Sequence, residues 1–137
     1  MACPYFYPGE RLADSAWLVP PRLPLMDPYA GECRANCDPH RPDDELLRQA
    51  CNPGYGRERC ACFPANARAD AVRFHVADDG RDLIRIQWVY EKDCWPVEHG
   101  LLEYSMATQG FLGEPGDLLL WRQAAVFVEG WIRRSRT

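Results

Sequence analysis

The chain has 137 residues, of which 47 % are hydrophobic and 26 % are charged, and a formal net charge of −4. This composition is typical of a single folded domain spanning residues 1–137 and excludes a disordered chain. The negative charge argues against nucleic-acid binding, and the absence of a long apolar run and of a secretory signal predicts a cytoplasmic protein without a membrane span.

The two halves of the sequence differ in composition. Residues 1–64 contain ten of the twelve prolines and six of the seven cysteines. Such a segment disfavours long regular elements, whereas residues 65–137 show regular hydrophobic patterns. We therefore predict an α+β fold, in which an antiparallel hairpin or small sheet packs on a C-terminal helix. A metal site is expected to hold the irregular, cysteine-rich half in place on this scaffold.

In the first half, residues 9–18 are predicted to form a short helix, and residues 20–29 an extended segment because of their prolines. Residues 41–51 have the pattern of a second helix. Pro42 suits its first turn, the acidic residues 43–45 favour its N-terminus, and Asn52-Pro53-Gly54 ends it. Cys51 is therefore expected at the C-terminus of this helix.

The second half begins with a hairpin over residues 71–90, in which apolar residues alternate on both sides of a polar turn. The alternating apolar residues of both strands have even numbers. They share a face only if the residue numbers of two paired residues add up to an even number, as with Val76 opposite Ile84. A two-residue Asp-Gly turn gives an odd sum, so we predict a loop of three or five residues.

Residues 99–106 form either a third strand or a connector. Residues 114–134 are predicted to form a helix whose wide apolar stripe covers the hairpin. The basic residues after it, Arg133, Arg134 and Arg136, are interpreted as a solubilising helix end.

The seven cysteines need an explanation other than disulfides in a cytoplasmic protein, because thiols stay reduced there and an odd number cannot pair completely. Four interpretations compete: an iron–sulfur cluster, a structural zinc ion, disulfides, and ordinary small buried side chains. The cysteines are Cys3, Cys33, Cys37, Cys51, Cys60, Cys62 and Cys94.

The spacing of the cysteines weakens some of these interpretations. Zinc knuckles usually contain C-x2-C to C-x4-C pairs, and ferredoxins contain C-x2-C-x2-C. Here the close pairs are Cys33-x3-Cys37 and Cys60-x-Cys62, and the other cysteines are single. Single cysteines on separate loops are able to hold a cluster when those loops converge. The spacing thus weakens zinc without excluding it. The surroundings of the cysteines favour a [4Fe–4S] cluster, with zinc as the alternative.

Four cysteines are the preferred ligands: Cys3, Cys33, Cys51 and Cys60. Cys3 precedes a proline that fixes its turn, Cys33 follows a turn at residues 29–31, and Cys51 leads into a glycine-bearing loop whose amides can approach sulfur. Cys60 closes this loop, although Cys62 is an alternate ligand that spacing does not exclude. Arg57 and Arg59 would offset the negative charge of a cluster.

The sequence resembles small bacterial cysteine-rich proteins of unknown function that begin CPYF-x-P. The matching segments are Cys3 to Pro8, Pro20 to Cys33 and Cys51 to Pro64, so the resemblance covers nearly the full length. It implies that Cys3, Cys33, Cys51 and Cys60 are the recurring ligands, with Cys37, Cys62 and Cys94 as extras. It implies iron–sulfur binding but no particular activity.

No catalytic motif is visible, and none of His40, His75 and His99 has metal-ligand spacing to another histidine. His75 is expected to face solvent. The first functional hypothesis is a small iron–sulfur protein whose cluster is structural or transfers single electrons to a larger protein partner. The second is a zinc- or thiol-stabilised interaction module without a redox role. The third is an enzyme that uses the cluster or a reactive Cys94.

Overall fold

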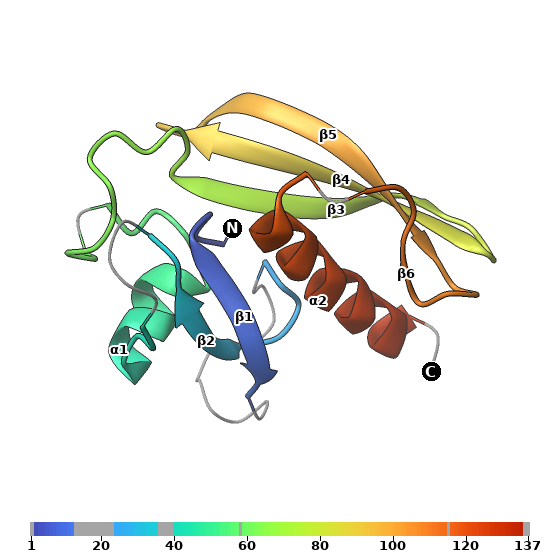
Figure 1. The fold of residues 1–137 in the computed structure, drawn as a ribbon, viewed down its shortest axis with the longest axis horizontal. Helices are drawn as coiled ribbons and strands as arrows, with labels where there is room; N and C mark the ends of the chain where they lie inside the picture. Colours follow the sequence, from blue (N-terminus) through green and yellow to red (C-terminus); the bar gives the residue numbers. More distant parts are fainter. Residues whose placement is uncertain (1, 13–23, 36–39, 58, 115, 136–137) are drawn as a thin grey trace.

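The computed structural model describes residues 2–12, 24–35, 40–57, 59–114 and 116–135. The described chain is α+β, as predicted, with two antiparallel sheets and a C-terminal helix (Figure 1). The smaller sheet pairs β1 (Phe6–Arg11) with β2 (Tyr29–Cys33). The larger sheet has the strand order β3-β4-β5-β6. The cysteine-rich half therefore contains a regular sheet that the sequence did not predict.

The predicted helix over residues 9–18 is wrong in its described part, because Gly9 to Arg11 belong to β1. Pairing with β2 decides this conformation over local helical periodicity. Gly31 of β2 allows the two strands to approach closely, since a Cβ atom there would lie 2.0 Å from the Tyr7 carbonyl oxygen. The remainder of the predicted helix lies outside the described residues.

The extended segment predicted over residues 20–29 is wrong over residues 24–27. Residues 24–27 form turns and bends, and Met26 has a φ of 73°. Residues 20–23 lie outside the described part of the chain. The chain returns to an extended conformation only at Pro28 and Tyr29, where β2 begins.

The helix predicted over residues 41–51 is present but shorter and less regular. It begins as α1 (Asp44–Leu46), and the Asp43 side chain caps it by accepting a hydrogen bond of 2.9 Å from the Leu46 N–H. It continues as η2 (Leu47–Cys51), one wide turn of π-helix. Cys51 ends the helix, as predicted.

The larger sheet contains β3 (Ala71–Asp79), β4 (Leu83–Lys92), β5 (Trp95–Ser105) and β6 (Gly110–Phe111). The loop between β3 and β4 has three residues, as the hydrophobic pattern predicted. The apolar residues of the two strands are paired on one face, as predicted, but Val76 lies opposite Ile86, not Ile84. A bulge after Val76 shifts the register near the turn, which a rule based on strict alternation misses. Residues 99–105 are part of a strand.

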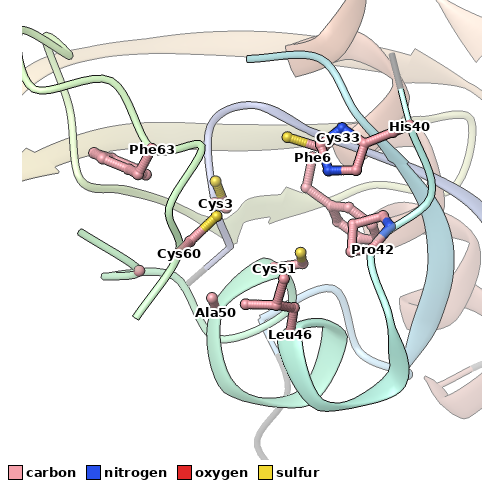
Figure 2. Close-up of a pocket in the computed structure, with 11 residues that line it drawn as sticks. Cys3, Phe6, Cys33, His40, Pro42, Leu46, Ala50, Cys51, Cys60 and Phe63 are labelled. Atoms are coloured by element: carbon pink, nitrogen blue, oxygen red, sulfur yellow. The ribbon is translucent and has the colours of Figure 1, made fainter. Parts of the chain in front are cut away.

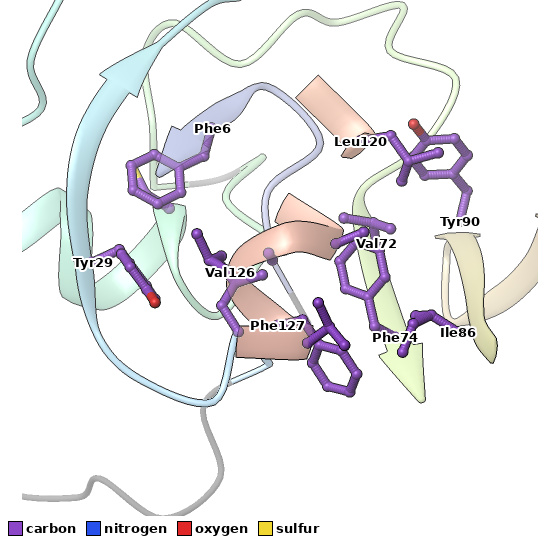
Figure 3. Close-up of a cluster of buried hydrophobic side chains, with 14 of the residues drawn as sticks. Phe6, Tyr29, Val72, Phe74, Ile86, Tyr90, Leu120, Val126 and Phe127 are labelled. Atoms are coloured by element: carbon purple, nitrogen blue, oxygen red, sulfur yellow. The ribbon is translucent and has the colours of Figure 1, made fainter. Parts of the chain in front are cut away.

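Helix α2 (Leu118–Ser135) lies between the two sheets (Figure 1). It starts four residues later than predicted, because the Asp117 carboxylate caps it by accepting hydrogen bonds from the Leu119 and Leu120 N–H groups. Figure 3 shows how its side chains divide between the sheets. Val126 lies toward Phe6 and Tyr29, whereas Phe127 packs on Phe74 with ring centroids 5.6 Å apart. The helix thus covers the hairpin, as predicted, and also the smaller sheet.

The basic end of α2 has a structural role that the sequence interpretation missed. Arg133 and Arg134 both donate to the carboxylate of Asp27, which is only 2 % exposed. Gly130, one turn earlier, allows the turn at Met26 to approach the helix, because a Cβ atom there would lie 2.6 Å from Met26 Cβ. Within the described ranges, no helix is long and apolar enough to cross a membrane.

Candidate metal centre

Four cysteines from separate segments line a single pocket (Figure 2). Cys3 precedes β1, Cys33 ends β2, Cys51 ends η2, and Cys60 lies in the loop that follows. These are the four ligands preferred on sequence grounds. The cavity between these side chains is small, with a volume of about 20 Å³. Its other lining residues are mostly apolar: Phe6, His40, Pro42, Leu46, Ala50, Gly56 and Phe63.

Backbone hydrogen bonds hold the cysteine-bearing segments together. The Cys3 N–H donates to the Cys51 carbonyl oxygen at 3.0 Å, which joins the start of the chain to the end of η2. The Cys33 N–H donates to the His40 carbonyl oxygen at 2.8 Å. This pairing places His40 in the pocket wall beside Cys33 (Figure 2). No spacing rule pointed to His40, because it reaches the pocket through this contact between distant backbone segments.

Asn52 connects the end of η2 with β2. Its side chain is fully buried, accepts a hydrogen bond from the Tyr29 N–H at 3.0 Å, and donates to the carbonyl oxygens of Tyr29 and Leu47. The Asn52 N–H also donates to the Leu47 carbonyl oxygen at 3.1 Å, which closes the π-helical turn. The Asn52 side chain therefore fixes Cys51 relative to the strand that carries Cys33. Sequence reasoning treated this residue only as a helix stop.

The glycine-bearing loop between Cys51 and Cys60 packs closely against Ala50 of η2, whereas the predicted approach of its amides to sulfur stays a prediction. Gly54 and Tyr55 both have a positive φ, 79° and 55°. At Gly56, an added Cβ atom would lie 2.9 Å from Ala50 Cβ, so this position favours glycine. The Gly56 carbonyl oxygen accepts a hydrogen bond from the Cys60 N–H at 2.8 Å. The resulting turn brings Cys60 to the pocket.

The four thiols influence one another electrostatically. The pKa of Cys3 is raised to about 12, chiefly by burial and to a smaller extent by the nearby Cys33 and Cys60, against the lowering effect of the backbone of Tyr5 and Phe6. Burial also raises the pKa of Cys51 strongly, followed by the effects of Cys3, Cys33 and Cys60. Thiolates in such a pocket would need a cationic group to offset their charge.

The side chains as placed do not form a ready-made site for a metal ion. Across the residues that the structure describes, no group of three or more His, Cys, Asp or Glu side chains meets the geometry for holding a metal ion. The structure thus brings the four cysteines to one pocket, but it does not support the predicted metal site that holds the cysteine-rich half in place.

The two arginines of the loop differ from the expectation that they offset cluster charge. Arg57 donates to Asp70 Oδ1 from Nη2 at 2.7 Å and from Nε at 3.0 Å, and its guanidinium lies 5.0 Å from the centre of the Phe63 ring. Asp70 thus largely neutralises its charge. Arg59 donates to the Gln49 carbonyl oxygen at 3.3 Å and remains exposed.

The other cysteines lie elsewhere or outside the described residues. Cys62 is partly exposed and does not line the four-cysteine pocket. Cys94 is exposed in the two-residue turn between β4 and β5 and lines a different pocket with Tyr55, Arg57, Arg59, Asp70 and Asp93. Cys37 lies outside the described residues. Among the histidines, His75 is exposed, as predicted, and His99 is exposed on β5.

Comparisons of the chain with protein-family models, curated proteins and solved structures found no match. The resemblance to cysteine-rich bacterial proteins therefore stays a prediction.

Proposed function

We propose that the protein binds a [4Fe–4S] cluster through Cys3, Cys33, Cys51 and Cys60. The observation that carries this proposal is the lining of one pocket by four thiols from segments far apart in the sequence. An all-sulfur donor set suits iron–sulfur clusters, which four cysteines usually hold. Cys60 takes precedence over Cys62 because it is the one that lines the pocket.

The walls around the four cysteines are suited to shield a cluster, since they include the apolar side chains of Phe6, Leu46 and Phe63. Such walls limit the access of water, which influences the reduction potential of a cluster. The cavity itself is about 20 Å³, so the side chains would have to move apart to admit a cluster. A zinc ion remains the alternative occupant, since zinc also accepts four thiolates.

The exposure of the ligands supports a role in one-electron transfer to a protein partner. A bound cluster would supply the site that accepts and releases a single electron. Cys33 and Cys51 are buried, at 8 % and 6 % exposure, whereas Cys3 and Cys60 are partly exposed. A partner would therefore approach from the side of Cys60 and Phe63. A purely structural cluster in the same place would join the smaller sheet, η2 and the glycine loop.

The proposal is tested by purifying the full-length protein without air and measuring iron, acid-labile sulfide, zinc and visible absorption. We expect about four irons and four sulfides per chain and the broad absorption of thiolate-to-iron charge transfer. Cys51→Ser should lose the cluster, because it removes a buried ligand. Cys94→Ser is the matched control and should retain it, since Cys94 lies in another pocket.

Two results would overturn the proposal. One is a colourless anaerobic preparation that contains stoichiometric zinc and no iron after attempted cluster reconstitution. The other is cluster loss in Cys94→Ser with retention in Cys51→Ser, which would show that a different set of thiols holds the group. Cluster loss in Cys62→Ser with retention in Cys60→Ser would replace Cys60 by Cys62.

A further inference from the structure

The turn that carries Cys3 is held from the opposite end of the sequence by Gln123 of α2. The side chain of Gln123 is 1 % exposed. Its Nε2 atom donates to the carbonyl oxygens of Cys3 at 2.8 Å and of Phe6 at 2.7 Å. A buried amide is costly unless it is hydrogen-bonded, so these two bonds fix the side chain and the turn together.

The same turn places backbone groups near the Cys3 sulfur. The backbone groups of Tyr5 and Phe6 lie near the Cys3 thiol and lower its pKa, against the larger effect of burial. The Phe6 N–H donates a hydrogen bond to the Cys3 carbonyl oxygen, with 3.1 Å between nitrogen and oxygen, and this bond closes the turn. Because Gln123 holds the carbonyl groups at both ends of this turn, it determines how the N–H groups of Tyr5 and Phe6 point relative to the sulfur.

We propose that Gln123 is a positioning residue that fixes the Cys3 turn, and with it the orientation of the backbone N–H groups around the Cys3 sulfur, and thereby influences the reduction potential of the cluster. The inference rests on the proposed function for its redox part. Hydrogen bonds to ligand sulfur favour the more negatively charged, reduced cluster, and they are one of the means by which a protein tunes the potential. Weakening them lowers the potential without removing a ligand.

The test compares the full-length, cluster-loaded protein with Gln123→Met, Gln123→Glu and Arg122→Met. Methionine has a similar length but no N–H donor, and glutamate keeps the shape but turns an oxygen toward the two carbonyl groups. Arg122→Met is the matched control. Arg122 also joins α2 to β1, through a 2.7 Å hydrogen bond from Nε to the Pro8 carbonyl oxygen, but it does not contact the Cys3 turn.

We expect both Gln123 variants to keep four irons per chain and to have a more negative reduction potential in a redox titration. Arg122→Met should keep the potential of the unchanged protein. An unchanged potential in both Gln123 variants would overturn the inference. An equal shift in Arg122→Met would also overturn it, because the effect would then come from general loosening between α2 and β1.

A second measurement uses the cluster-free full chain and is independent of the redox role. A thiol-specific reagent is applied, and the labelling of each cysteine is followed by peptide mass spectrometry. Cys3 should react several-fold faster in Gln123→Met than in the unchanged protein, with exposed Cys94 as the internal reference. Unchanged labelling of Cys3 would contradict the positioning role. If no form of the protein binds iron but Cys3 still reacts faster, the proposed cluster fails while the positioning of Cys3 by Gln123 stands.

Discussion

The scaffold of β3–β6 and α2 and the described part of residues 2–63, the cysteine region, share one apolar core but differ in the contacts that surround it. In the scaffold, large apolar residues fill the interior, among them Ile84, Ile86 and Phe127. Around the pocket of the cysteine region, Ala50, Cys51 and Asn52 are the buried residues at the end of η2. Phe6, Leu25 and Tyr29 of the cysteine region belong to the same apolar core as the scaffold. The end of η2 is joined to β2, in addition, by the buried hydrogen bonds of Asn52.

This difference separates two kinds of sensitivity. Loss of apolar volume in the scaffold should lower the global stability, since α2 packs against both sheets. Loss of a buried amide in the cysteine region should release the ligand-bearing segments while the larger sheet stays folded, because regions of one protein can open separately. The three predictions below test this separation.

The largest expected effect is that of Phe127→Ala. Phe127 is 6 % exposed and stacks on Phe74 across the interface between α2 and β3. Its truncation should lower the free energy of unfolding by about 3–5 kcal/mol, the usual cost of an aromatic-to-alanine change in a core. Chemical denaturation followed by circular dichroism measures this change. The control Trp95→Ala, at a residue 74 % exposed, should change stability by less than about 0.5 kcal/mol.

The same contrast explains how much of the fold was predictable. Hydrophobic alternation identified the hairpin over residues 71–90, and helical spacing identified α2, because apolar burial leaves a periodic pattern in the sequence. The strand β1 was missed, since its conformation depends on pairing with β2 across an intervening segment of the chain. Buried polar contacts leave no period, which is why Gln123 and the role of Asn52 did not emerge.

The candidate site was predictable to a similar degree. The proline after Cys3 and the glycines after Cys51 indicated turns, and the structure brings the four preferred cysteines to one pocket. His40 was missed because only its backbone pairing with Cys33 brings it there. Arg57 was assigned to the cluster on proximity in sequence, whereas Asp70, which the sequence did not connect with it, binds its guanidinium.

The second prediction concerns the cysteine region alone. Asn52→Ala removes the hydrogen bonds to the Tyr29 N–H and to the carbonyl oxygens of Tyr29 and Leu47. Leaving buried polar groups unsatisfied should cost about 2–3 kcal/mol. Amide hydrogen exchange should show faster exchange in β2 and η2 and unchanged protection in β4. Gln49→Ala is the matched control on the same helix, because its side chain donates a hydrogen bond to the exposed Glu45 at 3.4 Å.

If β4 loses protection in Asn52→Ala to the same extent as β2, the two regions unfold as one unit and the proposed separation is wrong. A local loss without any change in Gln49→Ala would support it. Cluster content in the same variant sharpens the comparison, since release of η2 from β2 should increase the rate at which iron is lost.

The smallest effect is expected at Asp70, which joins the two regions. Burial alone would raise the pKa of Asp70, but hydrogen bonds from the Asp93 N–H and from Arg57 outweigh it and lower the pKa below its usual value. A carboxylate with a lowered pKa stabilises the fold above the pKa of the unfolded chain, about 3.9, and loses this contribution as the pH falls through the folded pKa. The stability advantage of the unchanged protein over Asp70→Asn should therefore be constant near neutral pH and shrink below about pH 4. Its size should be about 1–2 kcal/mol, since Arg57 is one-third exposed and the pair is partly screened.

The measurement at Asp70 is the free energy of unfolding from pH 7 to pH 2, with both proteins compared in the same cofactor state at each pH. An advantage that grows toward low pH would contradict the sign derived from the lowered pKa. Hydrogen exchange at neutral pH adds the regional information. Because Asp70 connects the glycine loop with the turn at Asp93, Asp70→Asn should speed exchange at Tyr55 and Asp93 more than in the middle of β4. Such a pattern would show that this carboxylate connects the cysteine region to the scaffold through local hydrogen bonds, apart from the apolar core that the two regions share.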